Sequence, residues 1–281
     1  MQPISDRSSG AIREIFGTDK ALIGMIHCPP FPGAPRYRGA TMTAIADACM
    51  RDAEALLEGG LDGLIVENHG DIPFSKPEDI GPETPAFMAV VTDRIARATG
   101  APLGVNVLAN APMPAFAIAV AGGARFIRVN QWANAYVANE GFIEGRAAEA
   151  MRYRSLLRAE HVKVFADSHV KHGAHAITAD RTIGELTRDL AFFDADAVIA
   201  TGQRTGDSAA LDEIETIAAA THLPVLVGSG VTAGNIAAIL ERTQGVIVAS
   251  SLKHDGVWWS PVDPARVKAF VAAARGGEGR A

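Results

Sequence analysis

Cysteine is scarce in this chain: its 281 residues include two, Cys28 and Cys49. Neither belongs to a Cys-x-x-Cys pair, so the sequence argues against a zinc site built from thiolates. The N-terminal segment is polar and lacks the apolar run of a signal peptide. Low cysteine content is typical of a reducing compartment, and we therefore expect a cytoplasmic protein.

Long apolar runs and a basic surplus are also lacking. The richest apolar stretch, residues 115–124, is well short of the roughly 20 residues that a membrane-spanning helix needs. Lys and Arg together number 26 against 32 Asp and Glu, which gives a formal net charge of −6. Non-specific binding to nucleic acid requires a basic surface. We therefore expect neither an integral membrane segment nor a nucleic-acid partner.

What the chain does have is a repeated alternation of short apolar runs and longer amphipathic segments. The expected strands cover residues 21–27, 63–69, 102–109, 126–131, 162–168, 197–201, 224–228 and 245–250. The expected helices cover residues 42–57, 84–99, 114–121, 141–159, 183–193, 209–221, 233–242 and 264–274. Strands that are apolar throughout are buried on both faces, as in a parallel sheet.

Eight such units predict an α/β fold, a single (β/α)₈ TIM barrel. A doubly wound open sheet is the alternative, but it rarely contains eight evenly spaced units. We expect one domain over residues 1–281. Residues 1–19 form an N-terminal extension with a capping helix at 12–16, and the Gly-rich residues 275–281 form a flexible tail.

Polar residues gather where the expected strands end. In a barrel of this type the carboxyl ends of the strands carry the chemistry, and a buried polar group without a partner costs about 1–3 kcal/mol. The opposite strand ends carry few such groups, so the asymmetry predicts a ligand site. The residues expected to bind substrate are His27, Asn68, Asn106, Asn130 and Thr201.

Two carboxylates, Glu67 and Asp167, end the second and fifth strands. Such a pair can divide acid and base roles when the two environments differ. Asp167 lies close in sequence to His169 and Lys171, which is compatible with a metal site or with a proton relay, and Lys171 would stabilise anionic charge. We therefore predict Asp167, Glu67, Lys171 and His169 as catalytic residues. The alternative is that each carboxylate forms an ion pair with Lys171 or Arg128.

Histidines near the strand ends raise the question of a metal. These histidines are His27, His69, His169, His172 and His175. Their spacing fits no familiar zinc pattern, so we assign neither a metal ligand nor a cofactor. A divalent cation held by Glu67, Asp167 and phosphate oxygens is the more plausible arrangement if an ion is bound.

The segment VGSGVTAGNI, followed by VASSLK, is the most specific element of the sequence. Loops after the seventh and eighth strands are the usual phosphate site of these barrels. The residues expected to bind phosphate are Gly228, Ser229, Gly230, Ser250 and Ser251. Thr232 is expected to cap a helix that begins near Ala233. Two tight turns with no ligand are the alternative.

Apolar residues outside the expected core predict a homo-oligomer. They are the Pro-rich loop after the first strand and the pair Trp258-Trp259. Patches of this kind usually have a partner, and we expect the two tryptophans to pack on a neighbouring subunit or on the base of the barrel.

Seven motifs occur in an order that resembles the BtpA/SgcQ family over about residues 20–272. They are IGMIHCPPFPGAP, GGLDGLIVENHGDIPF, GVNVLAN, RVNQWANAYV, ADSHVKH, VIATGQRTGD and VGSGVTAGNI. The resemblance implies a barrel similar to the ribulose-phosphate-binding group, with ADSHVKH and the glycines of the last motif at the site. The family is named after a cyanobacterial factor needed for photosystem I accumulation.

The leading hypothesis is an enzyme that acts on a small phosphorylated, sugar- or nucleoside-like compound by isomerisation, lyase chemistry or hydrolysis. The alternative is a non-catalytic assembly factor for a membrane protein complex, similar to a photosystem I biogenesis factor. A polar, preformed mouth favours the enzyme, whereas an exposed apolar patch favours the assembly factor.

Overall fold

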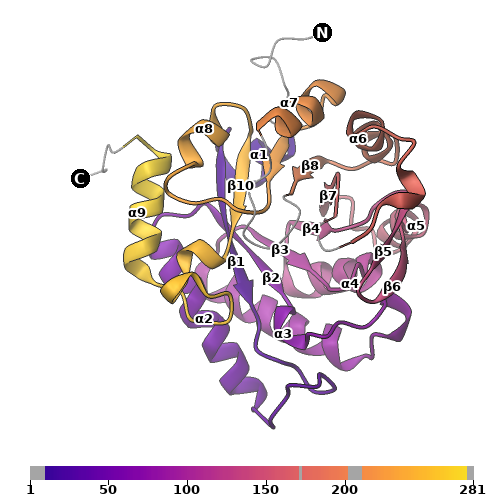
Figure 1. Ribbon diagram of the computed structural model, residues 1–281. Coiled ribbons are helices and arrows are strands. Elements are labelled where there is room, and N and C mark those ends of the chain that lie inside the picture. The colour runs from indigo at the N-terminus through magenta and orange to yellow at the C-terminus, as the bar shows by residue number, and fades with distance from the viewer. Residues whose placement is uncertain (1–9, 171–172, 202–210, 277–281) are drawn as a thin grey trace.

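Eight parallel strands close into a barrel in the computed structural model, which describes residues 10–170, 173–201 and 211–276 (Figure 1). The order around the barrel is β1-β10-β9-β8-β7-β4-β3-β2. The barrel strands are β1 (Ala21–His27), β2 (Gly63–Glu67), β3 (Leu103–Asn106), β4 (Phe126–Val129), β7 (Lys163–Asp167), β8 (Ala197–Ala200), β9 (Val225–Val227) and β10 (Gly245–Val248). The predicted TIM barrel is therefore confirmed.

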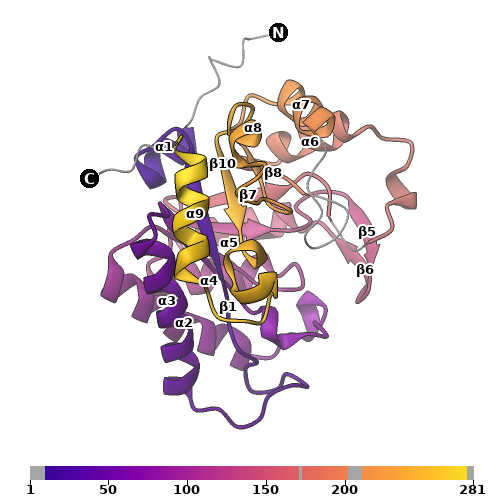
Figure 2. The same cartoon turned by 60° about the vertical axis from the view of Figure 1, so that its left-hand side comes forward.

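Helices form the outer layer of the barrel (Figures 1 and 2). They are α2 (Met42–Glu58), α3 (Glu83–Thr99), α4 (Pro112–Gly122), α5 (Ala147–Leu156), α6 (Ile183–Phe192), α7 (Leu211–Ala220), α8 (Ile236–Leu240) and α9 (Pro264–Ala274). Local signals explain several ends: Thr41 caps α2, Thr182 and Glu185 form a capping box on α6, and Gly100 ends α3 with φ 64°.

The two larger buried clusters lie inside the barrel and between the barrel and its helices, and a third, small cluster lies at the β5-β6 hairpin. Inside, side chains such as Ile23, Phe126, Phe165 and Leu226 form one buried cluster. Gly104 faces this lumen, and a Cβ there would overlap the ring of Phe126. The aromatic ring thus fills the space that a glycine leaves on the neighbouring strand.

Helix α1 (Gly10–Phe16) covers the amino-terminal end of the barrel. Ile12 and Ile15 are buried in the lumen cluster, and the ring of Phe16 meets Phe126 edge-on with centroids 5.6 Å apart. The amino-terminal end of the barrel is therefore closed by apolar packing, and a ligand can enter at the carboxyl ends of the strands.

Two segments differ from the sequence-based expectation. Residues 135–144 form an antiparallel hairpin, β5 (Ala135–Ala138) and β6 (Gly141–Glu144), where a loop and the start of a helix were expected. Gly145 follows it and packs against the backbone of Ala133, so α5 begins only at Ala147.

The second difference concerns α8, which begins at Ile236 rather than near Ala233. Thr232 does not cap this helix. The side chain of Asn235 instead accepts a hydrogen bond from the Thr232 amide and donates one to the Gly230 carbonyl, which holds the preceding loop in a turn.

Within the part of the chain that the structure describes, no helix combines the length and the apolar character needed to cross a membrane.

Candidate functional site

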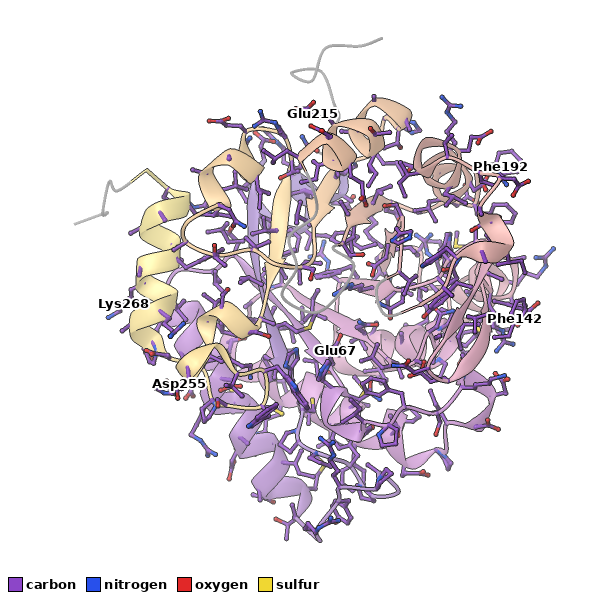
Figure 3. All side chains as sticks on the ribbon, in the orientation of Figure 1. Glu67, Phe142, Phe192, Glu215, Asp255 and Lys268 are labelled. Carbon is purple, nitrogen blue, oxygen red and sulfur yellow. The ribbon has the colours of Figure 1, made fainter. Side chains whose placement is uncertain are left out.

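One level of inward-facing polar residues crosses four neighbouring strands. The strand register makes successive Cα partners of His27, Glu67, Asn106 and Arg128, on β1, β2, β3 and β4. The inward-facing level below follows the same register and consists of Met25, Ile65, Gly104 and Phe126. The lumen therefore changes from apolar to polar toward the carboxyl ends of the strands, and Figure 3 shows Glu67 near the centre of the molecule.

Glu67 lies at the centre of this polar level. It is 5% exposed, and its two oxygens have different partners: Oε1 accepts a hydrogen bond from Asn106 Nδ2 at 2.7 Å, and Oε2 accepts one from His69 Nδ1 at 2.9 Å. Burial alone would raise the pKa of Glu67, but the hydrogen bond from His69 and nearby positive charge lower it. The side chain is thus held as a buried carboxylate.

His27 and His69 stand on either side of that carboxylate. Their rings stack with centroids 4.3 Å apart, and His27 Nε2 is 3.5 Å from Glu67 Oε2. His27 Nδ1 donates a hydrogen bond to the Trp258 carbonyl at 3.0 Å. Burial lowers the pKa of His27 to about 3, so the ring is neutral at neutral pH.

Trp258 closes this side of the mouth. Its ring meets that of His69 edge-on, with centroids 4.4 Å apart, and it lines the cavity described below. Trp258 therefore does not pack on the barrel base, because the loop after β10 folds back over the mouth. Trp259, by contrast, is 70% exposed.

Asp167 and Arg128 form a second buried group. Arg128 donates from Nε to Asp167 Oδ1 at 3.0 Å and from Nη2 to Oδ2 at 2.9 Å, and Asn130 Nδ2 donates to Oδ2 at 3.2 Å. The side chains of Asp167 and Arg128 are 1% and 4% exposed. Of the alternatives considered for Asp167, the structure therefore shows the ion pair with Arg128. Lys171 lies outside the described residues.

A cavity of about 420 Å³ occupies the mouth and connects these groups to the last two strand ends. The residues that line it include His27, Glu67, His69, Arg128, Asn130, Tyr136 and Trp258. The five residues expected to bind phosphate also line it, namely Gly228, Ser229, Gly230, Ser250 and Ser251. The volume suits a small metabolite.

Packing and backbone geometry explain the glycines of this wall. A Cβ on Gly228 would lie 2.6 Å from Ile199 Cγ2 and 3.4 Å from Arg128 Nη2, so the guanidinium of Arg128 reaches across the lumen to the loop after β9. Gly230 has φ 65°, a conformation that favours glycine. Ser251 Oγ donates to the Val231 carbonyl at 2.7 Å and ties the two loops together.

Residues 18–276 match the sequence profile of the BtpA family. The chain belongs to the BtpA family. It is 42% identical over 258 residues to a protein of Archaeoglobus fulgidus, and the alignment covers 92% of this chain and 100% of the relative. It is 39% identical over 261 residues to the photosystem I biogenesis protein BtpA of Synechocystis sp., and that alignment covers 92% of this chain and 90% of the relative.

Solved structures resemble this BtpA-family barrel in fold. Thiamine phosphate pyrophosphorylase from Pyrococcus furiosus aligns with a TM-score of 0.55 at 14% identity, over 93% of this chain and 98% of that one. A tryptophan synthase chain from M. tuberculosis aligns with a TM-score of 0.58 at 18% identity, over 95% and 98%. At these identities the likeness shows the fold alone.

Three of the residues predicted for the site have other roles in this BtpA-family barrel. Asn68 donates to Asp71 and to the Leu108 carbonyl and accepts from the Leu108 amide, so its side chain joins two loops. The Thr201 hydroxyl donates to the His169 carbonyl. Among the described residues that line the cavity, none of these three is present, and neither are Asn106 and Asp167, which contact it through Glu67, Arg128 and Asn130.

His169 forms a histidine pair outside the cavity lining. Its ring lies 4.0 Å from that of His175 between centroids, and its Nδ1 is buried without a hydrogen-bond partner in the described structure. Burial, with a smaller contribution from His175, lowers the pKa of His169 to about 4. The ring is therefore neutral at neutral pH.

Arg128 and His69 contribute more to the site than their sequence context predicts. Arg128 had been considered only as a counter-ion, yet it follows Phe126 by two positions in a buried strand, and the two-residue period of a strand places both on the lumen face. His69 had been considered only as one histidine among five. Nothing local in the sequence shows that its ring returns to Glu67, because that contact depends on the turn after β2.

Proposed function

We propose that this BtpA-family protein is an enzyme that acts on a small phosphorylated metabolite bound in the mouth of the barrel. One observation carries the proposal: a single cavity is lined both by the loops after β9 and β10 and by the buried group of His27, Glu67 and His69. The loops would hold the phosphate, and the buried group would meet the reacting part of the substrate.

The loops offer favourable chemistry for an anion. Gly228–Gly230 brings backbone close to the cavity without side chains at its two glycines, and Ser250 adds a hydroxyl group, whereas the Ser251 hydroxyl already donates to the Val231 carbonyl. The Arg128 guanidinium beneath Gly228 brings positive charge to the same wall, although Asp167 neutralises part of it. Structural neighbours named as an N-(5'-phosphoribosyl)anthranilate isomerase and an orotidine 5'-phosphate decarboxylase are consistent with a phosphate-binding barrel.

Asn130 provides a further polar group for a ligand. It is 8% exposed and lines the cavity, and its Oδ1 has no hydrogen-bond partner in the described structure, while its Nδ2 is held by Asp167. A buried acceptor without a donor is costly, and a substrate hydroxyl would satisfy it. Glu67 and His69 would face the reacting part of the substrate in this arrangement, and Asp167 would act as a positioning residue for Arg128 and Asn130.

A charge reversal tests the phosphate site. Ser250→Asp places a carboxylate beside the proposed phosphate, whereas Ser155→Asp adds the same charge to an exposed position on α5. Isothermal titration with ribose 5-phosphate and with inorganic phosphate should show binding to the wild type and to Ser155→Asp, and at least about tenfold weaker binding to Ser250→Asp. Equal affinity of all three proteins, or no binding to any, would contradict the proposal.

A second candidate function has its own observation. Leu156, Phe192 and Phe193 are 76%, 82% and 41% exposed, and the two phenylalanines line a groove beside α5. Figure 3 shows Phe192 at the edge of the molecule. One relative is named a photosystem I biogenesis protein. If this chain were an assembly factor of that kind, an exposed apolar surface would be where it docks on a partner. In a strain lacking this protein, complementation by Glu67→Gln but not by Phe192→Glu would favour this second function over the enzyme.

A further inference from the structure

The three side chains at the base of the cavity have the arrangement of a ligand set. His69 Nδ1 is 2.9 Å and His27 Nε2 is 3.5 Å from the same oxygen, Glu67 Oε2, and one ligand atom of each residue lies within 4.8 Å of the others. Two donors that each lie about 2.0–2.1 Å from one ion are separated by roughly 2.9 Å in octahedral and 3.4 Å in tetrahedral geometry. The two separations from Glu67 Oε2 agree with a shared ion.

We propose that His27, Glu67 and His69 bind one divalent transition-metal ion. Among the residues that the structure describes, they are the group of three His, Cys, Asp or Glu side chains that come together closely enough to do so. Binding of the ion depends on these three side chains alone, whereas a part for the ion in catalysis rests on the function proposed above.

Hydrogen bonding orients His27 for an ion. The Trp258 carbonyl can only accept, so His27 Nδ1 carries a proton, and Nε2 is the ring nitrogen that faces Glu67 Oε2. Histidines that bind metals usually donate their other ring nitrogen to a carbonyl or carboxylate in this way.

Glu67 is oriented by a comparable contact. Asn106 donates to Oε1 at 2.7 Å, and this leaves Oε2 as the oxygen directed at both histidines. In the ion-free protein a proton on His69 Nδ1 occupies the position of the ion, because a carboxylate oxygen can only accept. Binding of the ion therefore requires His69 to present the lone pair of Nδ1, with its ring proton on Nε2.

The donor set selects the class of ion. Two imidazole nitrogens and one carboxylate suit Zn²⁺, Fe²⁺ or Co²⁺, whereas Mg²⁺ and Ca²⁺ prefer sites made of oxygen. Three protein ligands are typical of catalytic sites, which keep a further position for water or substrate. All three residues line the cavity, so that position would be open to the ligand held by the loops after β9 and β10.

The metal-free protein, titrated without any phosphate compound, tests the site. After treatment with a chelator, the wild type should bind one Zn²⁺ in a calorimetric titration and one Co²⁺ with visible absorption bands. Glu67→Gln and His69→Gln should weaken Zn²⁺ binding at least about 100-fold, and Asn106→Leu by about 10–100-fold, as expected for a residue that orients a ligand. His161→Gln, at an exposed position, is the matched control and should bind as the wild type does.

Two measurements keep the outcome clear. Circular dichroism shows whether each variant is folded, and anomalous scattering at the zinc edge locates the ion in crystals. A zinc peak at exposed histidines, or Zn²⁺ affinity unchanged in both Glu67→Gln and His69→Gln, would overturn the metal site. If zinc binds at this site but phosphate compounds do not bind the wild type, the proposed function fails and the metal site stands. If phosphate compounds bind the wild type but not Ser250→Asp, and zinc does not bind, the metal site fails and the proposed function stands.

Discussion

Arg128 and Asp167 form a two-point ion pair across neighbouring strands β4 and β7, with both hydrogen bonds at 2.9–3.0 Å and both side chains almost fully buried. The pair holds the carboxylate that sequence reasoning had placed first among the catalytic candidates. It also aims the guanidinium at the loop after β9. Asp167 and Glu67 therefore have separate partners. Asp167 orients the guanidinium of Arg128, and Glu67 faces His27 and His69.

Asp167→Asn should destabilise the protein, because it leaves the Arg128 cation buried without a counter-ion. Loss of one partner of a buried pair costs about 3–5 kcal/mol, to be measured by urea unfolding. Asp47→Asn removes a half-exposed pair with Arg94 and should cost no more than about 1 kcal/mol. Unchanged unfolding of Asp167→Asn would show that the pair is not structural and would restore Asp167 as a candidate proton-transfer group.

Gly104→Ala should destabilise the barrel from inside. The new Cβ would overlap the ring of Phe126, which itself stacks on Phe165 with centroids 4.5 Å apart. Overpacking of this kind costs about 1–3 kcal/mol in thermal or urea unfolding.

Gly184→Ala is the matched control for that substitution. Gly184 lies in α6, and a Cβ there would meet its nearest neighbour, Ala220 Cβ, at 3.5 Å, an ordinary contact. Alanine favours a helix over glycine by roughly 0.5–1 kcal/mol, so this variant should be slightly more stable than the wild type. If Phe126→Leu in the Gly104→Ala background does not recover stability, the overlap with the ring is not the cause.

His169 should make the protein less stable as the pH falls. Burial, followed by His175, lowers the pKa of His169 to about 4 in the folded state, below the roughly 6.5 of an unfolded chain. Between these two values the unfolded chain binds the proton and the folded protein does not, so the free energy of unfolding falls as the pH drops through that window.

Urea unfolding at pH 7 and pH 5 measures this contribution. His169→Gln cannot titrate and should lose less stability than the wild type between the two pH values. Carbon-detected spectra of labelled histidine provide an independent check, because the His169 resonance, assigned by its absence in the variant, should not shift until the pH approaches 4. A midpoint near 6.5 would contradict the prediction.

The sequence determined the architecture of this protein and much of the placement of its polar residues. The apolar run of β1 predicted Ala21–His27, as observed, because a strand that packs on both faces must be apolar nearly throughout. The positions of His27, Glu67, Asn106 and Asp167 at strand ends followed from the same runs, since all parallel strands of a barrel end at one rim. These are local properties, and local sequence specifies them.

Only the tertiary structure decided which of these residues meet. His27, Glu67, Asn106 and Arg128 come to one level through the register of four strands, and register is set by closure of the whole barrel rather than by any one segment. Trp258 reaches His69 because the loop after β10 returns over the mouth. Contacts between residues far apart in sequence depend on packing that no local pattern contains, and the chemistry of this cavity lies in those contacts.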